Sequence, residues 1–286
     1  MSSVRLAMRL GATALAGIAL MVPGATLASA RAPGRTTAGS LIGASVSAAA
    51  HKGIVPPKKP AKSLQPSPFF PRSSSCAKGK DGSKCNALVL KAIAHARKVL
   101  EKLGGMSFSL SAFEKLTPIE QLFATVNLER TERGLPPAAV LTRSLDKIAQ
   151  RGAEIDQDPN LQDVPNPLPG GGHLSGLGGN WAGGWGNALG ADYGWMYDDG
   201  IGSDNGDCSR SHKSGCWGHR DNILGTFDSK ADCRGGRHEL AMGAGHVTKG
   251  KKYGDSEAEL FAGVCGPTPT DVVISWTRVK HLLHVK

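Results

Sequence analysis

The sequence predicts an α+β fold for the region after residue 85, and three observations lead to it. Apolar residues recur at helical spacing in the first half of that region, two apolar strands joined by a charged turn lie in the second half, and no internal repeat is present. Helices that precede locally joined strands are typical of α+β folds, whereas alternating strands and helices indicate a doubly wound parallel sheet. The pattern therefore favours α+β.

The first two helices are marked by their periodicity and by their end signals. Apolar residues recur at helical spacing over 86–103 until Gly104 and Gly105 stop the run, which predicts an amphipathic helix. This helix either packs on the main domain or stands apart from it. The segment 117–120 then supplies an N-cap threonine, a proline at the first helical position and a capping-box glutamate, and Gly134 is placed to end the second helix.

Two more amphipathic helices, a long loop and a short helix are expected next. Residues 141–155 carry an apolar stripe at helical spacing, and residues 187–198 carry another. Between them, residues 160–186 are rich in Gly, Pro and Asn and lack periodicity, which predicts a long loop. A short helix is expected to begin near Gly218.

Two segments near the C-terminus, 239–247 and 259–265, are predicted to be the strands of one hairpin. Both are rich in apolar and small residues, and a charged turn over 249–255 joins them. Residues 272–276 are a weaker strand candidate. We therefore expect residues 271–286 to form a C-terminal tail or one extra strand.

The first 30 residues have the composition of a signal peptide. Arg5 and Arg9 give a basic start, an apolar run follows over 11–20, and 28–30 read Ala-Ser-Ala, the small-residue pattern that precedes a cleavage site. The apolar run is short and rich in Gly and Ala, and no later segment is long and apolar enough to span a membrane, so we expect no transmembrane anchor after cleavage. Residues 31–75 are rich in Ala, Pro, Ser and Lys, which predicts a disordered basic linker.

The net charge of +10 comes from the N-terminal region. Residues 1–80 contain eleven Lys or Arg and no Asp or Glu, which leaves 23 basic and 24 acidic residues in the remainder. A nearly neutral globular region gives no reason to expect binding to nucleic acid. The basic segment either contacts an anionic cell envelope or serves only as a solvated linker.

All six cysteines follow the expected signal peptide, so a secreted, extracellular chain would form three disulfides. No C-x-x-C motif indicates a zinc site. Two pairs lie close together in the sequence and favour local bridges, which leaves the last two cysteines to pair with each other. The expected pairs are Cys76 with Cys85, Cys208 with Cys216, and Cys233 with Cys265. Residues 76–107 are accordingly expected to be a disulfide-bearing segment that includes the first helix.

Five short motifs follow one another between residues 110 and 266. They are NLERTERGLPP at 127–137, GH at 172–173, GNWA at 179–182, WMYD at 195–198 and GHRDNIL at 218–224. A glycine-flanked strand segment at 243–245 completes the set. In this order the motifs resemble the CAP superfamily, also called SCP-like extracellular proteins, and most closely its secreted bacterial branch. The resemblance implies an α–β–α sandwich with a central cleft, placed here over 108–270.

The resemblance also implies what the cleft contains, since family members usually have two histidines and two acidic residues there. By position the histidines are His173 and His219, and one acid is Asp198. The second acid belongs to a Gly-Glu-Asn motif, where this chain has Gly178-Gly179-Asn180. Glycine offers no side chain as a base or ligand, so this departure puts a carboxylate-dependent mechanism in doubt.

Each candidate also has a simpler structural interpretation. His173 lies in a glycine-rich loop typical of surface histidines, His219 is placed to donate to a carbonyl at a helix start, and Asp198 would solvate a helix end. Two neutral imidazoles nevertheless suit zinc, so we expect His173 and His219 to share one weakly bound divalent ion, with water completing its coordination. Four tryptophans form either an aromatic cleft wall or ordinary core: Trp181, Trp185, Trp195 and Trp217.

Two function classes are consistent with these residues. The first is a secreted CAP-domain protein that binds a small apolar ligand, a sterol or an envelope component in its cleft without turnover. The second is a metal-assisted or acid/base hydrolase of peptide or cell-wall substrates, with His173, His219 and Asp198 as candidate catalytic residues. Gly179 opposes the hydrolase. The chain also lacks a G-x-S-x-G elbow, which disfavours a serine nucleophile.

Overall fold

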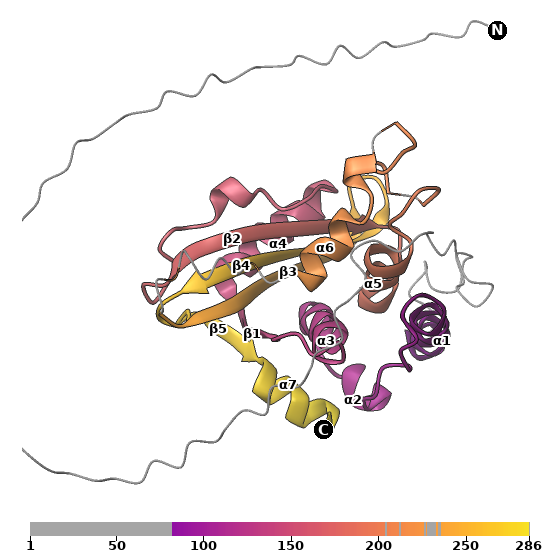
Figure 1. The fold of residues 1–286 in the computed structure, drawn as a ribbon, viewed down its shortest axis with the longest axis horizontal. Coiled ribbons are helices and arrows are strands. Elements are labelled where there is room, and N and C mark those ends of the chain that lie inside the picture. Colours follow the sequence, from indigo (N-terminus) through magenta and orange to yellow (C-terminus); the bar gives the residue numbers. More distant parts are fainter. Residues whose placement is uncertain are drawn as a thin grey trace, which may run out of the picture. The chain divides into compact units, whose positions relative to one another are not determined.

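The computed structural model describes residues 82–203, 205–211, 213–225, 227, 233 and 236–285. The expected signal peptide, the basic linker and Cys76 lie outside these residues. Within them, seven α-helices accompany one five-stranded mixed sheet (Figure 1). The prediction of an α+β fold is therefore confirmed.

The sheet has the strand order β2-β4-β3-β1-β5. The strands are β1 (Ala138–Thr142), β2 (His173–Gly183), β3 (His238–Gly250), β4 (Gly254–Cys265) and β5 (Val272–Ser275). β1 and β3 run parallel, whereas the other neighbouring pairs are antiparallel. The predicted hairpin is β3–β4, and its turn spans only 251–253. β2 thus forms one edge of the sheet, and β5 forms the other.

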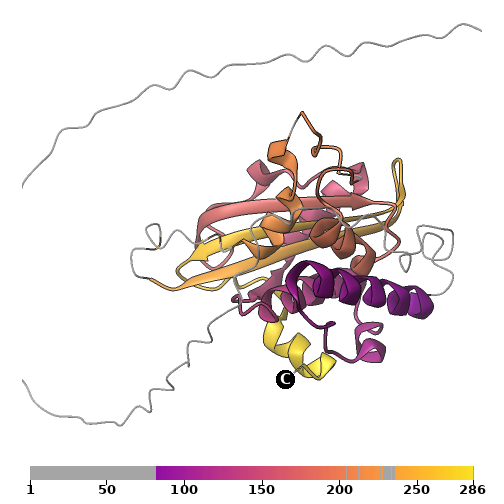
Figure 2. The same cartoon turned by 45° about the vertical axis from the view of Figure 1, so that its right-hand side comes forward.

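Helices cover both faces of the sheet (Figures 1 and 2). They are α1 (Gly82–Glu101), α2 (Leu110–Phe113), α3 (Pro118–Thr131), α4 (Arg143–Ile155), α5 (Ala188–Tyr197), α6 (Gly218–Leu224) and α7 (Trp276–Leu283). α4 packs against β3 and β4 on one face, whereas α3, α5 and α6 lie on the other, with α1 beside α5. The structure therefore has three layers, helix on sheet on helix.

Two glycines of β3 allow α4 to lie directly on the sheet. A Cβ at Gly243 would be 2.3 Å from the carbonyl carbon of Leu145, and one at Gly245 would be 2.4 Å from the Cα of Gln150. Any larger residue would push α4 away, which explains why this strand interior carries glycine despite its cost in chain entropy. The glycine-flanked motif at 243–245 thus has a role in helix–sheet packing.

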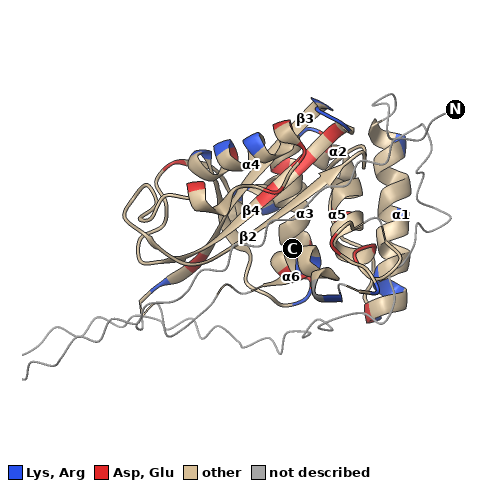
Figure 3. Ribbon diagram, turned by 90° about the horizontal axis from the view of Figure 1, so that it is seen from above, with Lys and Arg blue, Asp and Glu red and all other residues tan. Residues whose placement is uncertain are grey.

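Helix α1 packs on the domain, which decides between the two arrangements left open by the sequence. Its apolar residues Val89, Ala92, Ile93 and Ala96 are fully buried in the main core. The helix ends at Glu101, where acidic and basic residues gather close to α6 (Figure 3). α1 is therefore part of the folded unit.

The charged groups at this contact form a buried ion network, defined by Arg97, Glu101, Glu129, Glu132, Arg133 and Arg220. Arg97 Nη1 donates to Glu129 Oε2 at 2.7 Å, and Arg133 pairs with both Glu129 and Glu101. Burial would raise the pKa of Glu129, but the charges of Arg133 and Arg97 outweigh it and lower that pKa. The network links α1, α3 and α6 through ionised side chains.

Several local predictions agree with the structure. Thr117 and Glu120 form the expected capping box of α3. The helix predicted over 187–198 is α5, and Asn187 is its N-cap, accepting from the Gly190 N–H at 2.9 Å. The disulfides Cys208–Cys216 and Cys233–Cys265 are both formed. The predicted Cys76–Cys85 pair lies outside the described residues because Cys76 does. No helix in the part of the chain that is described is long and apolar enough to cross a membrane.

The predicted loop over 160–186 is wrong, because most of its second half is the edge strand β2. β2 pairs with β4 along almost its entire length. Its glycines hid the strand from a composition argument, yet close packing requires some of them. A Cβ at Gly178 would lie 2.7 Å from Asn222 Oδ1 and 2.8 Å from the ring of Phe227.

Two element boundaries also need correction. Leu141 belongs to β1 and pairs with Met242 and Ile274, so the predicted helix over 141–155 begins only at Arg143. At the C-terminus, the expected extra strand is present as β5, but α7 follows it directly, with Ser275 as the N-cap. Where a short strand is followed directly by a helix, the sequence does not show where one ends and the other begins, because both the strand and the helix bury apolar residues.

Candidate functional site

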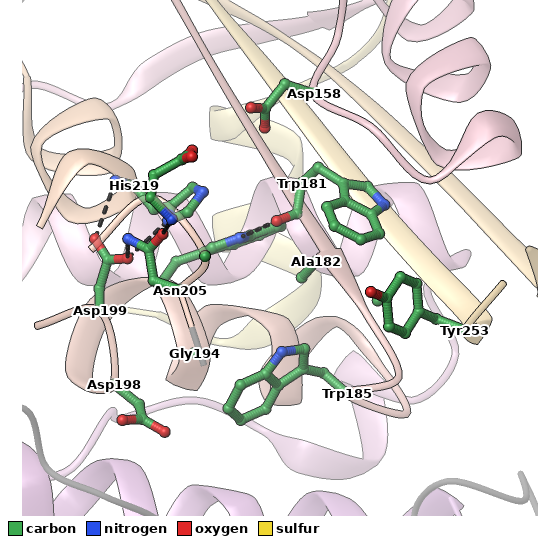
Figure 4. A pocket seen from close by; sticks show the side chains of 14 residues that line it. Asp158, Trp181, Ala182, Trp185, Gly194, Asp198, Asp199, Asn205, His219 and Tyr253 are labelled. Carbon is green, nitrogen blue, oxygen red and sulfur yellow. Dashed lines mark hydrogen bonds and ion pairs between the residues drawn. The ribbon is translucent and has the colours of Figure 1, made fainter. Parts of the chain in front are cut away.

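A cleft of about 510 Å³ opens at the edge of the sheet, beside the last residues of β2 (Figure 4). It lies between α5, the start of α6, the segment 205–207 and the β3–β4 turn. Its lining includes four acidic residues, four large aromatic residues and one histidine: Asp158, Asp198, Asp199, Asp207, Trp181, Trp185, Trp195, Tyr253 and His219. This combination makes the cleft the candidate functional site.

His219 is held in the cleft by Asp199. The imidazole Nδ1–H donates to Asp199 Oδ1 at 2.7 Å, and the backbone N–H of His219 donates to Asp199 Oδ2 at 3.1 Å. The Arg220 N–H approaches the same oxygen at 3.4 Å. One carboxylate therefore caps the first turn of α6 and fixes the tautomer and orientation of the histidine.

Asn205, which lies just before the loop closed by the Cys208–Cys216 disulfide, holds Asp199 from its other side. Asn205 Nδ2 donates to Asp199 Oδ1 at 2.6 Å and to the Gly215 carbonyl at 3.1 Å. Trp217, which packs on the disulfide, adopts a left-handed backbone with φ of 68° immediately before α6. This uncommon conformation for a large residue turns the chain so that His219 enters the cleft.

The charges of the cleft favour the protonated form of His219. Burial would lower the pKa of His219, but the hydrogen bond to Asp199 and the negative charges of Asp199, Asp158 and Asp207 outweigh it, so the pKa is raised above 6.5. Burial raises the pKa of Asp158 in turn, while the charge of His219 opposes that rise. The two residues therefore act on each other across the cleft.

Aromatic side chains form the opposite wall. Trp181 and Tyr253 lie with ring centroids 5.4 Å apart, and Trp181 Nε1 donates to Ser256 Oγ at 2.7 Å. Trp195 Nε1 donates to the Trp181 carbonyl at 3.1 Å, which locks a second indole in place. Of the four predicted tryptophans, only Trp217 lies away from the cleft, in the small cluster with Cys208 and Cys216.

The structure does not bring the two predicted metal ligands together. His173 starts β2 opposite Cys265, whereas Asn180, seven residues later, donates to the His219 carbonyl at 3.0 Å. At about 3.3 Å per strand residue that separation is roughly 23 Å, so one ion cannot contact both imidazoles. Within the described ranges, no group of three or more His, Cys, Asp or Glu is placed to hold a metal ion.

Asp198 lines the cleft as expected, but the neighbouring Asp199 is the partner of His219. Figure 4 shows the carboxylate of Asp199 directed at His219 and that of Asp198 directed away from it. Asp198 ends α5, with its N–H bonded to the carbonyls of Tyr193 and Gly194. Helical periodicity alone could not choose between two adjacent aspartates at a helix end, since the chain leaves the helix there.

Asn180 joins two of the sequence motifs beneath the cleft. Its buried amide donates to Glu259 Oε1 at 2.7 Å as well as to the His219 carbonyl, and Asn222 donates to Asn180 Oδ1 at 2.9 Å. The GNWA and GHRDNIL motifs are therefore in direct contact. These hydrogen bonds give Asn180 a structural role that does not depend on an acid at position 179.

Asp158 is a cleft residue that the sequence did not single out. A Cβ at Gly179 would lie 3.3 Å from Pro159, the next residue along the chain from Asp158. The position where the resemblance implies an acid is therefore adjacent to a segment that carries one. The available signal was an Asp-Pro pair just after a helix, which is common at helix ends and carries little information about function.

Comparison of the chain with models of protein families, with curated proteins and with solved structures found no match.

Proposed function

We propose that this chain is a secreted CAP-type protein that binds a small ligand in the cleft around His219. The proposal is supported by the signal-like N-terminus, the two disulfides, and the three-layer fold. The motif GHRDNIL and the motif GNWA meet at this cleft, which supports a common role for them.

The observation that carries the proposal is the chemical character of the lining. Carboxylates of Asp158, Asp199 and Asp207 act together on His219, and indole and phenol rings face them from the other wall. The described lining residues include no Lys or Arg. Such a site favours a ligand with a flat apolar part and a positive charge, because rings and carboxylates both attract cations. The ligand is therefore cationic as well as apolar.

Benzamidine, a planar cation, is expected to bind the protein, whereas the neutral isostere benzamide binds at least about tenfold more weakly and benzoate does not bind. Calorimetric titration at low salt measures all three. Asp158→Asn is expected to weaken benzamidine binding, and Asp163→Asn, which removes an exposed carboxyl outside the cleft, is the matched control. Equal affinities for benzamidine and benzamide would contradict a cation-selective cleft.

A second candidate function, acid/base hydrolysis, is favoured by the pairing of His219 with Asp199. With Nδ1–H donated to the carboxylate, a neutral His219 offers Nε2 as a base, an arrangement that many hydrolases use to activate a hydroxyl or a water. Because the pKa of His219 is raised, a base function requires a pH above 6.5.

This hydrolase candidate predicts release of product from a quenched peptide library or from labelled cell-wall fragments, rising with pH as His219 loses its proton. His219→Ala is expected to abolish the release and Asp163→Asn to leave it unchanged. Release no greater than the protein-free blank, or equal release from the His219 variant, would eliminate this candidate.

A further inference from the structure

Arg220, the residue after His219, connects the cleft to helix α1. Its side chain is only 1% exposed. Nη1 donates to the Met196 carbonyl at 2.8 Å near the end of α5, and Nη2 donates to Glu101 Oε1 at the end of α1. Its backbone N–H is also directed at the Asp199 carboxylate. One side chain thus joins three helices at the point where His219 meets Asp199.

Glu101 is fixed in place to hold this arginine. Its side chain is only 1% exposed, and its two oxygens pair with Arg220 and with Arg133 of the ion network. The Nε of Arg133 donates to Oε1 at 3.0 Å. Burial would raise the pKa of Glu101, but the hydrogen bond and charge of Arg133 and the charge of Arg220 lower it, which keeps the carboxylate ionised. Among the described residues, Glu101 is the carboxylate that forms an ion pair with Arg220.

We propose that Glu101 is a positioning residue for the cleft, although it lies on a helix outside the expected CAP boundaries. Through Arg220 it holds the first turn of α6 against the end of α5, and so keeps the His219 imidazole on Asp199. A planar guanidinium shared between a carboxylate and a carbonyl restrains both partners at once. The α1 helix is then a functional part of the site. The inference relies on the proposed function only for its ligand readout.

The test uses Glu101→Gln, with Glu132→Gln as the matched control. Both substitutions remove one carboxylate from the same ion network, but Glu132 pairs with Arg97 and does not contact Arg220. The measurement is the rate at which the His219 Nδ1 proton exchanges with solvent, observed by NMR. A general loss of stability would not speed the exchange of this proton selectively.

Glu101→Gln is expected to speed this exchange at least about tenfold relative to Glu132→Gln, and to weaken benzamidine binding in parallel. Glu101→Asp, which keeps the charge, is expected to restore part of the protection. Unchanged exchange in Glu101→Gln, or equal acceleration in Glu132→Gln, would overturn the proposal.

Arg220→Lys provides a second variant in case Glu101→Gln fails to fold. The ammonium keeps the charge inside the network but cannot bond Glu101 and Met196 together as the planar fork does, so fast exchange at His219 is again expected. Exchange at the wild-type rate would overturn the inference. If exchange responds as expected but benzamidine does not bind the wild type, the positioning role stands and the proposed ligand class fails.

Discussion

Replacing Glu129 by Gln is expected to lower the free energy of unfolding by about 3–5 kcal/mol, the largest loss we expect from a single polar substitution in this protein. Glu129 is fully buried and receives bonds from Arg97, Arg133 and Tyr197, the last at 2.6 Å. Its loss leaves two buried guanidinium groups with one carboxylate fewer. Urea unfolding at neutral pH measures the change.

Glu132→Gln again serves as the control for this substitution. The Glu132 side chain is 23% exposed, and Arg97 keeps its ion pair with Glu129 when Glu132 is replaced, so we expect a loss of about 1 kcal/mol. If both variants lose the same free energy, burial does not set the strength of this network. A Glu129 variant as stable as the wild type would mean that the desolvation of the ions cancels their attraction.

Glu259→Gln is expected to remove a large part of the loss of stability that the wild type suffers as pH rises. Burial raises the pKa of Glu259 from 4.5 to about 8, and the hydrogen bond from Asn180 only partly opposes this. Between these two values the native state keeps a proton that the unfolded state has lost. Wild-type stability therefore falls with pH by up to about 1.4 kcal/mol per unit at this residue.

The measurement is the difference in unfolding free energy between wild type and Glu259→Gln at about pH 5, 6.5 and 8. These pH values span roughly the range between the two pKa values. At each higher pH, the variant is expected to be more stable relative to the wild type than at the pH before. Asp146, whose pKa is raised to about 7 by burial, contributes in the same direction but is present in both proteins and cancels. Glu154→Gln on the exposed face of α4 is the control. A difference that does not change with pH would show that Glu259 is ionised throughout.

The sequence was most informative where a single local interaction defines an element. Thr117 and Glu120 identify the start of α3 because the capping box involves only four consecutive residues. The strand β2 was missed because its glycines are explained by contacts with Phe227 and Asn222, which are distant in the chain. Local composition cannot contain that information.

The candidate site shows the same division. His219 and the tryptophans were identified from motifs, and three of the four tryptophans line the cleft with it. The pairing of His219 with Asp199 and not with Asp198 depends on how the chain leaves α5, and the position of Asp158 in the cleft depends on how α4 meets β2. Both depend on tertiary structure. The prediction that His173 and His219 share one ion failed because motifs give only the order of residues along the chain. The length of β2 sets the distance between the two histidines.

The strand order has a consequence for how the chain reaches its native state. β1 lies between β3 and β5, and its partners Met242 and Ile274 are about a hundred or more residues away in the sequence. Closing such long loops costs entropy before any pairing compensates for it, so folding should be slow for a domain of this size. During synthesis, β1 and the helices α3 and α4 emerge long before either partner strand. Until then their apolar surfaces are exposed to chaperones and to other unfinished chains.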